Sequence, residues 1–311
     1  MYPSHSVIFF TTASGAGYGL LALIGLLAPF SVAPQDTRFG LAALVLALFG
    51  ITAGLLSSML HLGRPERAWR ALSQFRTSWL SREGVAAVAT YLPAGLFAVA
   101  WIFFGTVSWP LGVLAALGCA ATVYCTGMIY RSLKPVPRWH NAWVVPNYLA
   151  LALMTGSLWL AFIAQVFGPH PALSILAIAA VVLAAALKLG YWRSIDTARS
   201  ASTAGSATGL GSLGTVRHFE APHTSENYLL KEMGYRIARK HAAKLRRIAL
   251  VLGFGLPGLL SLVPLVSSGW PAVAAALVAA SVAMTGVFIE RWLFFAEAKH
   301  AVTLYYGEAA V

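Results

Sequence analysis

The chain contains eight apolar segments of about 20 residues, the length that an α-helix needs to cross the hydrocarbon core of a bilayer. Hydrophobic residues make up 59% of the 311 residues and charged residues only 10%, against about 25% charged residues in an ordinary soluble domain. A soluble globular domain and a disordered chain are therefore excluded. The sequence predicts an all-α polytopic membrane protein, with two four-helix bundles as one arrangement of its helices. The eight transmembrane helices are expected at residues 7–30, 40–60, 84–105, 110–130, 144–167, 171–189, 248–268 and 270–293.

Lys and Arg are distributed unevenly over the connections between these segments. The connections after the second, fourth and sixth segments are basic, as is the C-terminal tail. Of the 22 Lys and Arg residues, only Arg38 falls on the opposite side. By the positive-inside rule the basic side faces the cytoplasm, which predicts that both termini are cytoplasmic. The rule also accounts for the formal charge of +12, so no nucleic-acid partner is expected.

The connections divide the chain into four parts: five transmembrane helices in 1–167, a sixth in 168–189, a basic cytoplasmic loop in 190–247, and two more helices with a cytoplasmic tail in 248–311. Within the loop, residues 197–216 are rich in Ser, Thr, Ala and Gly, which predicts that they lack regular structure.

An amphipathic helix is predicted at the end of that loop. Thr224 or Ser225 can cap it, and Leu229, Met233 and Ile237 recur every four residues. Such a helix could lie on the membrane surface or dock a partner, and the sequence leaves both open.

Two dipeptides recur at similar spacing in the two halves of the chain. Leu92-Pro93 and Trp109-Pro110 resemble Leu256-Pro257 and Trp270-Pro271. These pairs suggest a parallel repeat of four helices, although Leu, Pro and Trp are common enough in membrane helices for chance to explain them.

Ionisable residues are expected to be absent from the interior of every segment. Lys188 and Glu290 lie near segment ends, where long side chains can reach the interface. An ion transporter is therefore disfavoured, while transport of a small neutral solute remains an alternative. A b-type haem is also disfavoured, because no histidine lies inside a segment to ligate the iron.

The end of the second segment carries the most informative residues. His61 directly follows the apolar run, and Gly63 comes two residues later. At this depth an imidazole can donate a hydrogen bond to a quinone carbonyl and relay a proton to it, and a glycine allows a ring to approach the backbone. On these residues alone, a histidine bonded to a loop carbonyl is the commoner arrangement.

Two motifs resemble the signatures of the membrane-anchor subunits of dimethyl sulfoxide reductase-type molybdoenzymes. The first is SSMLHLGRPERAW followed by SWLSRE, and the second is MIYRSLKPVPRWHNAWVVP, so that the motifs lie within 58–146. The resemblance implies eight helices, no haem or other metal in this chain, and a site for a quinone, ubiquinone or menaquinone. It further implies a lipid environment in the bacterial inner (plasma) membrane and two partners, an iron–sulfur subunit and a catalytic subunit with molybdopterin.

The resemblance also assigns roles to individual residues. His61 becomes the quinone-site histidine, flanked by Gly63 and Arg64, and Glu83 becomes a candidate proton-relay carboxylate. Arg131, Trp139 and Trp143 would frame the surface that faces the iron–sulfur subunit. The alternatives are that Glu83 only complements the helix dipole, and that the second group is an interfacial belt.

Two departures from the reductase anchors indicate a branch of this family. The insertion at 190–247 and the cytoplasmic end of the second segment look more like the anchor of a cytoplasmic sulfite-oxidising enzyme, as do SVIFFTTASGAGYGLL and FEAPHTSENYLLKEMGYR. The resemblance therefore implies sulfite oxidation coupled to quinone reduction, with a quinol-oxidising anchor of an S- or N-oxide reductase as the alternative.

Overall fold

The computed structural model describes residues 3–60, 62–198, 202–217, 219–220, 233 and 237–311. Eight helical segments in this part of the chain are long and apolar enough to cross a membrane, which confirms the predicted fold class. Seven are the single helices α1 (His5–Leu27), α2 (Thr37–Met59), α3 (Trp79–Phe104), α4 (Trp109–Arg131), α5 (Val144–Phe167), α6 (Pro171–Thr197) and α12 (Trp270–Ala296). The remaining span is composite, with α9 (Ile237–Leu250), the π-helix η4 (Val251–Gly255), α10 (Leu256–Leu260) and α11 (Val263–Val266).

The helices begin and end where the sequence supplies caps. The Asp36 carboxylate accepts hydrogen bonds from the backbone N–H groups of Arg38 and Phe39, at 3.0 and 3.2 Å, and so starts α2. Proline occupies the first turns of α4, α6 and α12, where a missing N–H costs nothing. Gly105, with φ of +63°, ends α3 in the left-handed region that glycine tolerates.

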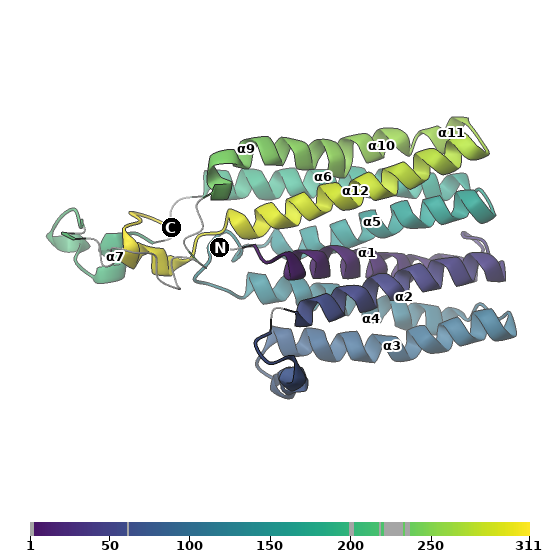
Figure 1. The fold of residues 1–311 in the computed structure, drawn as a ribbon, viewed down its shortest axis with the longest axis horizontal. Helices are drawn as coiled ribbons and strands as arrows, with labels where there is room; N and C mark the ends of the chain where they lie inside the picture. Colours follow the sequence, from purple (N-terminus) through teal and green to yellow (C-terminus); the bar gives the residue numbers. More distant parts are fainter. Residues whose placement is uncertain (1–2, 61, 199–201, 218, 221–232, 234–236) are drawn as a thin grey trace.

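The helices run side by side along the long axis, and both termini lie at the same end (Figure 1). In that view α1–α4 fill the lower half and α5, α6, α9–α11 and α12 the upper half. α1 packs against α2, α4, α5 and α12. A Cβ atom on Gly19 would collide with the backbone of Ala152 and Gly156 in α5. The small residues thus bring the two halves into backbone contact, which is how membrane helices commonly associate.

The proposed internal repeat remains a prediction, but its prolines occupy matching places. Pro93 lies inside α3, and Pro257 lies inside the composite span just after the π-helix η4, where the Leu256 N–H donates to the Val251 carbonyl. This wide turn offers room for a proline ring that would crowd a regular helix. Pro110 and Pro271 both occupy the first turn of the following helix.

Several helices extend farther than the predicted spans at the end that carries the termini. α3 begins at Trp79 instead of 84, α6 continues to Thr197 instead of 189, and α12 continues to Ala296 instead of 293. The composite seventh span starts with α9 at Ile237, ahead of the apolar segment that begins at 248. The polar residues of these extra turns pair with one another: Arg246 contacts Asp196 at 2.6 Å and Glu297 at 2.8 Å. Because the charges are neutralised between helices, the helical backbone continues beyond the apolar segments.

A small lobe protrudes from the same end, and it corrects one prediction. Residues 197–216 were expected to lack regular structure, yet they contain α7 (Ala204–Thr208) and the 3-10 helix η3 (Gly211–Leu213). The C-terminal tail stabilises them: Ser202 and Val311 exchange two backbone hydrogen bonds, and the Tyr305 hydroxyl donates to the Ala207 carbonyl at 3.1 Å. Composition alone could not reveal a partner so distant in the sequence.

The tail itself is ordered by the 3-10 helix η5 (Ala301–Tyr306). The Nδ1 atom of His300 accepts a hydrogen bond from the Val302 N–H at 3.0 Å. Burial of the ring lowers the pKa of His300 below its ordinary value, which favours the neutral imidazole that this acceptor requires. Of the predicted amphipathic helix, Leu229 and the caps Thr224 and Ser225 lie outside the described residues.

The charge distribution predicts that the lobe is cytoplasmic, and thiol labelling checks this. A Ser206→Cys variant, in α7, should not react with an impermeant thiol reagent added outside intact cells. Ser268→Cys, in the loop between α11 and α12 at the opposite end, should react. The unmodified chain, whose two cysteines lie in α4, provides the background. Labelling at 206 but not at 268 would reverse the orientation.

Candidate functional site

Glu83 is a buried carboxylate between α3 and α4. Ser78 caps α3, and its hydroxyl accepts from the Ser81 N–H at 3.4 Å. Glu83 follows beyond the first turn with 4% of its surface exposed, and its Oε1 is hydrogen-bonded to the Thr126 hydroxyl of α4. A residue that only complemented the helix dipole would not need this contact, so the geometry agrees better with a specific role for the carboxylate.

The Thr126 hydroxyl can serve both protonation states of that carboxylate. Besides contacting Glu83, its Oγ1 lies 3.0 Å from the Thr122 carbonyl. Since a hydroxyl has one proton and two acceptor sites, Thr126 can donate to an ionised Glu83. Alternatively it can donate to the Thr122 carbonyl and accept a hydrogen bond from the O–H group of a neutral Glu83. The pair is therefore suited to holding and releasing a proton.

The first motif lies at the same end of the molecule as Glu83. His61 lies outside the described residues. Gly63 and Arg64 are exposed, and a Cβ atom added to Gly63 would meet no described atom within 4 Å beyond its chain neighbours. The Ser57 hydroxyl donates to the Ser6 carbonyl at 3.1 Å, which ties the last turns of α2 to the start of α1. After the motif the chain forms the 3-10 helix η2 (Pro65–Gln74), which packs on α3.

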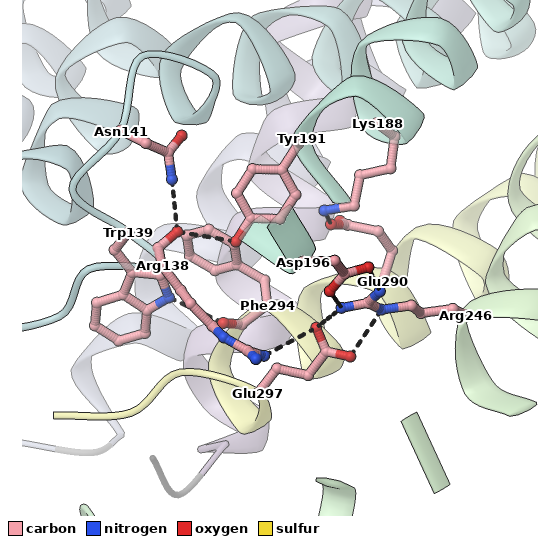
Figure 2. A network of polar contacts seen from close by, with 10 residues as sticks. All are labelled: Arg138, Trp139, Asn141, Lys188, Tyr191, Asp196, Arg246, Glu290, Phe294 and Glu297. Atoms are coloured by element: carbon pink, nitrogen blue, oxygen red, sulfur yellow. Dashed lines mark hydrogen bonds and ion pairs between the residues drawn. The ribbon is translucent and has the colours of Figure 1, made fainter. Parts of the chain in front are cut away.

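The second motif is built into an aromatic cluster. Trp139 is buried, and its Nε1–H donates to the Phe294 carbonyl at 2.9 Å (Figure 2). The cluster is formed by edge-on and stacked rings of Tyr130, Trp139, Tyr148, Phe294 and Phe295. Half-buried Trp143 starts α5 with Gly190 of α6 against its ring, and Arg131 ends α4 half-buried. Trp139 thus has a packing role, and its predicted part in a partner-facing surface remains a prediction.

The predicted site residues do not form one connected group. Among the residues that the structure describes, no hydrogen bond or ion pair links Glu83 to Gly63, Arg64, Arg131, Trp139 or Trp143. They share one end of the bundle, where α2 and α4 end and α3 and α5 begin (Figure 1).

A buried ion cluster corrects the expectation that the spans contain no interior charge. Lys188, Glu290 and Arg291 are exposed by only 1%, 0% and 2% of their side chains. Glu290 pairs with Lys188 of α6 and, at 2.5 Å, with Arg291 Nε. The prediction that Lys188 and Glu290 reach the interface is wrong, because each neutralises the other inside the protein. In the sequence, the adjacent Glu290 and Arg291 within an apolar run were the sign of this buried ion cluster.

A second ion-paired layer lies closer to the lobe. Arg246 of α9 binds Asp196 of α6 and Glu297 after α12, and Arg138 of the second motif lies 3.8 Å from Glu297. The Tyr191 hydroxyl donates to the Arg138 carbonyl at 3.1 Å. Figure 2 shows this layer beside the Lys188–Glu290 pair. The second motif is therefore tied to the helices of the chain's second half.

A small cavity lies between α1, α4, α5 and α12. Its volume is about 20 Å³. Thr126, the partner of Glu83, lines one side, and Tyr148 and Arg291 line another. The remaining wall is largely α1, with the hydroxyls of Thr11, Thr12, Ser14 and Tyr18. The cavity thus adjoins both the candidate carboxylate and the ion cluster.

The whole sequence is similar to known proteins. The family described as DMSO reductase anchor subunit (DmsC) matches residues 1–307. The C subunit of the sulfite dehydrogenase of Allochromatium vinosum is 34% identical over an alignment that covers 100% of both proteins. The C component of the anaerobic dimethyl sulfoxide reductase of Escherichia coli is 30% identical over 125 residues, which make up 36% of this protein and 39% of that one.

The ion cluster predicts a strong dependence of stability on Glu290. Replacing Glu290 by Gln leaves Lys188 and Arg291 without a counter-charge, and breaking a buried pair in this way costs about 3–5 kcal/mol. The variant should show a much lower melting temperature in detergent. Glu66→Gln is the control, because its pair with Arg67 is exposed and such pairs contribute about 1 kcal/mol or less. Equal melting temperatures for both variants would contradict the prediction.

Proposed function

Because the chain belongs to the family of DMSO reductase anchor subunits, we propose that it is the quinone-reactive membrane anchor of a molybdopterin oxidoreductase. In this proposal it binds an iron–sulfur subunit at the end of the bundle that carries the termini, and that subunit exchanges electrons with the catalytic subunit. Electrons pass between the iron–sulfur subunit and a quinone, ubiquinone or menaquinone, in the bacterial inner membrane.

Sulfite oxidation is the proposed reaction of the whole complex. The observation that carries it is the 34% identity to the C subunit of a sulfite dehydrogenase over an alignment that covers both proteins in full. The catalytic partner would convert sulfite and water into sulfate, two protons and two electrons. The quinone would take up two electrons and two protons to become the quinol, so electrons and protons balance.

This chain would supply the protons for that reduction. His61 is assigned to the quinone carbonyl from the motif, since an imidazole can donate a hydrogen bond and then a proton. Glu83 would replace that proton, and its bond to Thr126 supports the assignment because the pair accommodates both states of the carboxyl group. Gly63 and Arg64 belong to the same motif as His61 and are exposed, which leaves room for a ring and a polar headgroup.

Quinol oxidation by an S- or N-oxide reductase is the second candidate. It is favoured by the 30% identity to the C component of a dimethyl sulfoxide reductase, although that similarity covers only 36% of this protein. The same site would work in the opposite direction. Purified complex that reduces quinone with sulfite, but does not oxidise quinol with dimethyl sulfoxide, supports the first candidate.

Replacement of His61 tests the quinone site. His61→Ala should lower sulfite-dependent quinone reduction about 100-fold or more, the usual contribution of general acid–base catalysis. Reduction of an artificial acceptor by the catalytic partners should persist. His170→Ala is the matched control, because His170 caps α6 at the opposite end. Unchanged quinone turnover in His61→Ala would contradict the proposal.

Turnover should also be electroneutral. The Asp, Glu, Lys, Arg and His residues of the spans, other than Arg38, lie in the halves nearest the basic, predicted cytoplasmic side, so protons and electrons would both arrive from that side. A potential-sensitive dye in proteoliposomes should report no membrane potential during sulfite-dependent quinone reduction. A potential that an uncoupler abolishes would show that charge crosses the bilayer.

A further inference from the structure

Four buried polar atoms belong to side chains that line the cavity between α1, α4, α5 and α12 and make no hydrogen bond of good geometry within the described part of the chain. They are Thr12 Oγ1, Tyr18 OH, Tyr148 OH and Arg291 Nη1. All four side chains are more than nine-tenths buried. An unpaired buried polar group costs about 1–3 kcal/mol. Four such atoms around one space therefore point to a bound polar ligand that satisfies them.

The size of the cavity identifies this ligand as water. A cavity of about 20 Å³ has room for one or two water molecules, since each needs about 10–15 Å³. A quinone ring is far larger. A buried water typically makes about three hydrogen bonds, and the hydroxyls and the guanidinium offer donors and acceptors of both kinds.

The position of the cavity gives this water a function. Thr126 lines the cavity and also contacts Glu83, so a cavity water can reach the carboxylate through one hydroxyl. On the far side Arg291 Nη1 faces the cavity, while its Nε is held by Glu290 and its guanidinium lies 4.2 Å from the Tyr148 ring. Since arginine keeps its proton, it can orient the water but not pass a proton.

We propose that one or two water molecules in this cavity, positioned by Arg291 and Tyr148, deliver protons to Glu83 through the Thr126 hydroxyl. In each step Thr126 accepts a proton from the water and gives its own to the Glu83 carboxylate. The water then regains a proton that originates in the solvent at the end of the bundle carrying the termini. One proton moves and no group changes its oxidation state. The relay rests on the proposed quinone function, because Glu83 needs protons only if quinone is reduced.

Two variants that remove one hydroxyl each test the relay in the intact complex. Thr126→Val keeps the shape of the side chain and breaks the connection to Glu83. Tyr148→Phe keeps the ring against Arg291 and removes one ligand of the water. Both should lower quinone turnover, Thr126→Val by about 10- to 100-fold, and both should increase the ratio of rates in H₂O and D₂O. Reduction of an artificial acceptor should stay near the wild-type value, which shows that the complex is assembled.

Tyr124→Phe is the matched control, because Tyr124 is a half-exposed residue of α4 that packs on Trp79, outside the cavity. Its turnover and isotope ratio should equal those of the wild type. High-resolution cryo-electron microscopy of the complex supplies a readout independent of activity. Density for one or two waters within hydrogen-bond distance of Arg291 Nη1 and the Tyr148 hydroxyl is expected.

The outcomes separate this proposal from the proposed function. An empty cavity overturns water binding. Ordered water together with wild-type turnover and isotope ratio in Thr126→Val and Tyr148→Phe means a structural water only, and overturns the relay while the quinone function stands. If His61→Ala also retains full quinone turnover, the proposed function fails, and the density still decides whether the cavity binds water.

Discussion

The carboxylate of Glu290, held between Lys188 and Arg291, is the interaction on which the second half of the bundle depends. Ions of either sign are costly to bury alone, and the cost is offset only when opposite charges and hydrogen bonds surround them. Here Glu290 and Arg291 come from α12 and Lys188 from α6, while Tyr148 of α5 covers the guanidinium. The three helices can therefore pack closely only in the register that brings these groups together.

The two motifs differ in how far the packing of this chain explains their residue types. In the second motif, Tyr130, Val136 and Trp139 are buried, and Trp139 is bonded to the backbone of α12. In the first motif, Gly63, Arg64 and Trp69 are exposed, and within the described residues the Trp69 ring is contacted by the neighbouring Arg70 rather than buried in the bundle. Exposed residues without a structural role are the ones expected to contact a ligand or a partner.

The sequence was sufficient for features that depend on local pattern, and the similarity to known anchor subunits confirms the family resemblance drawn from the two motifs. Eight spans follow from the length of the apolar segments. Pairings between distant residues were missed. Lys188 and Glu290 lie far apart in the sequence, on α6 and α12, and each alone resembles a side chain that reaches toward the interface. The sequence did not predict the cavity for the same reason. Each hydroxyl that lines it belongs to an ordinary residue of one helix, and the cavity exists only once four helices have packed together.

The depth of the polar groups links the fold to the direction of proton movement. Glu83, Lys188, Glu290 and Arg291 all lie in the halves of their helices nearest the termini (Figure 1). The cavity extends inward only as far as Tyr18 and Thr155, near the middle of α1 and α5. Apart from Arg38 at the start of α2, the opposite halves of the spans carry no Asp, Glu, Lys, Arg or His side chain. A proton that enters this polar region would have to cross about 15 Å of apolar packing to leave on the other side. The proposed water relay to Glu83 would therefore open toward the end with the termini and not lead across the membrane.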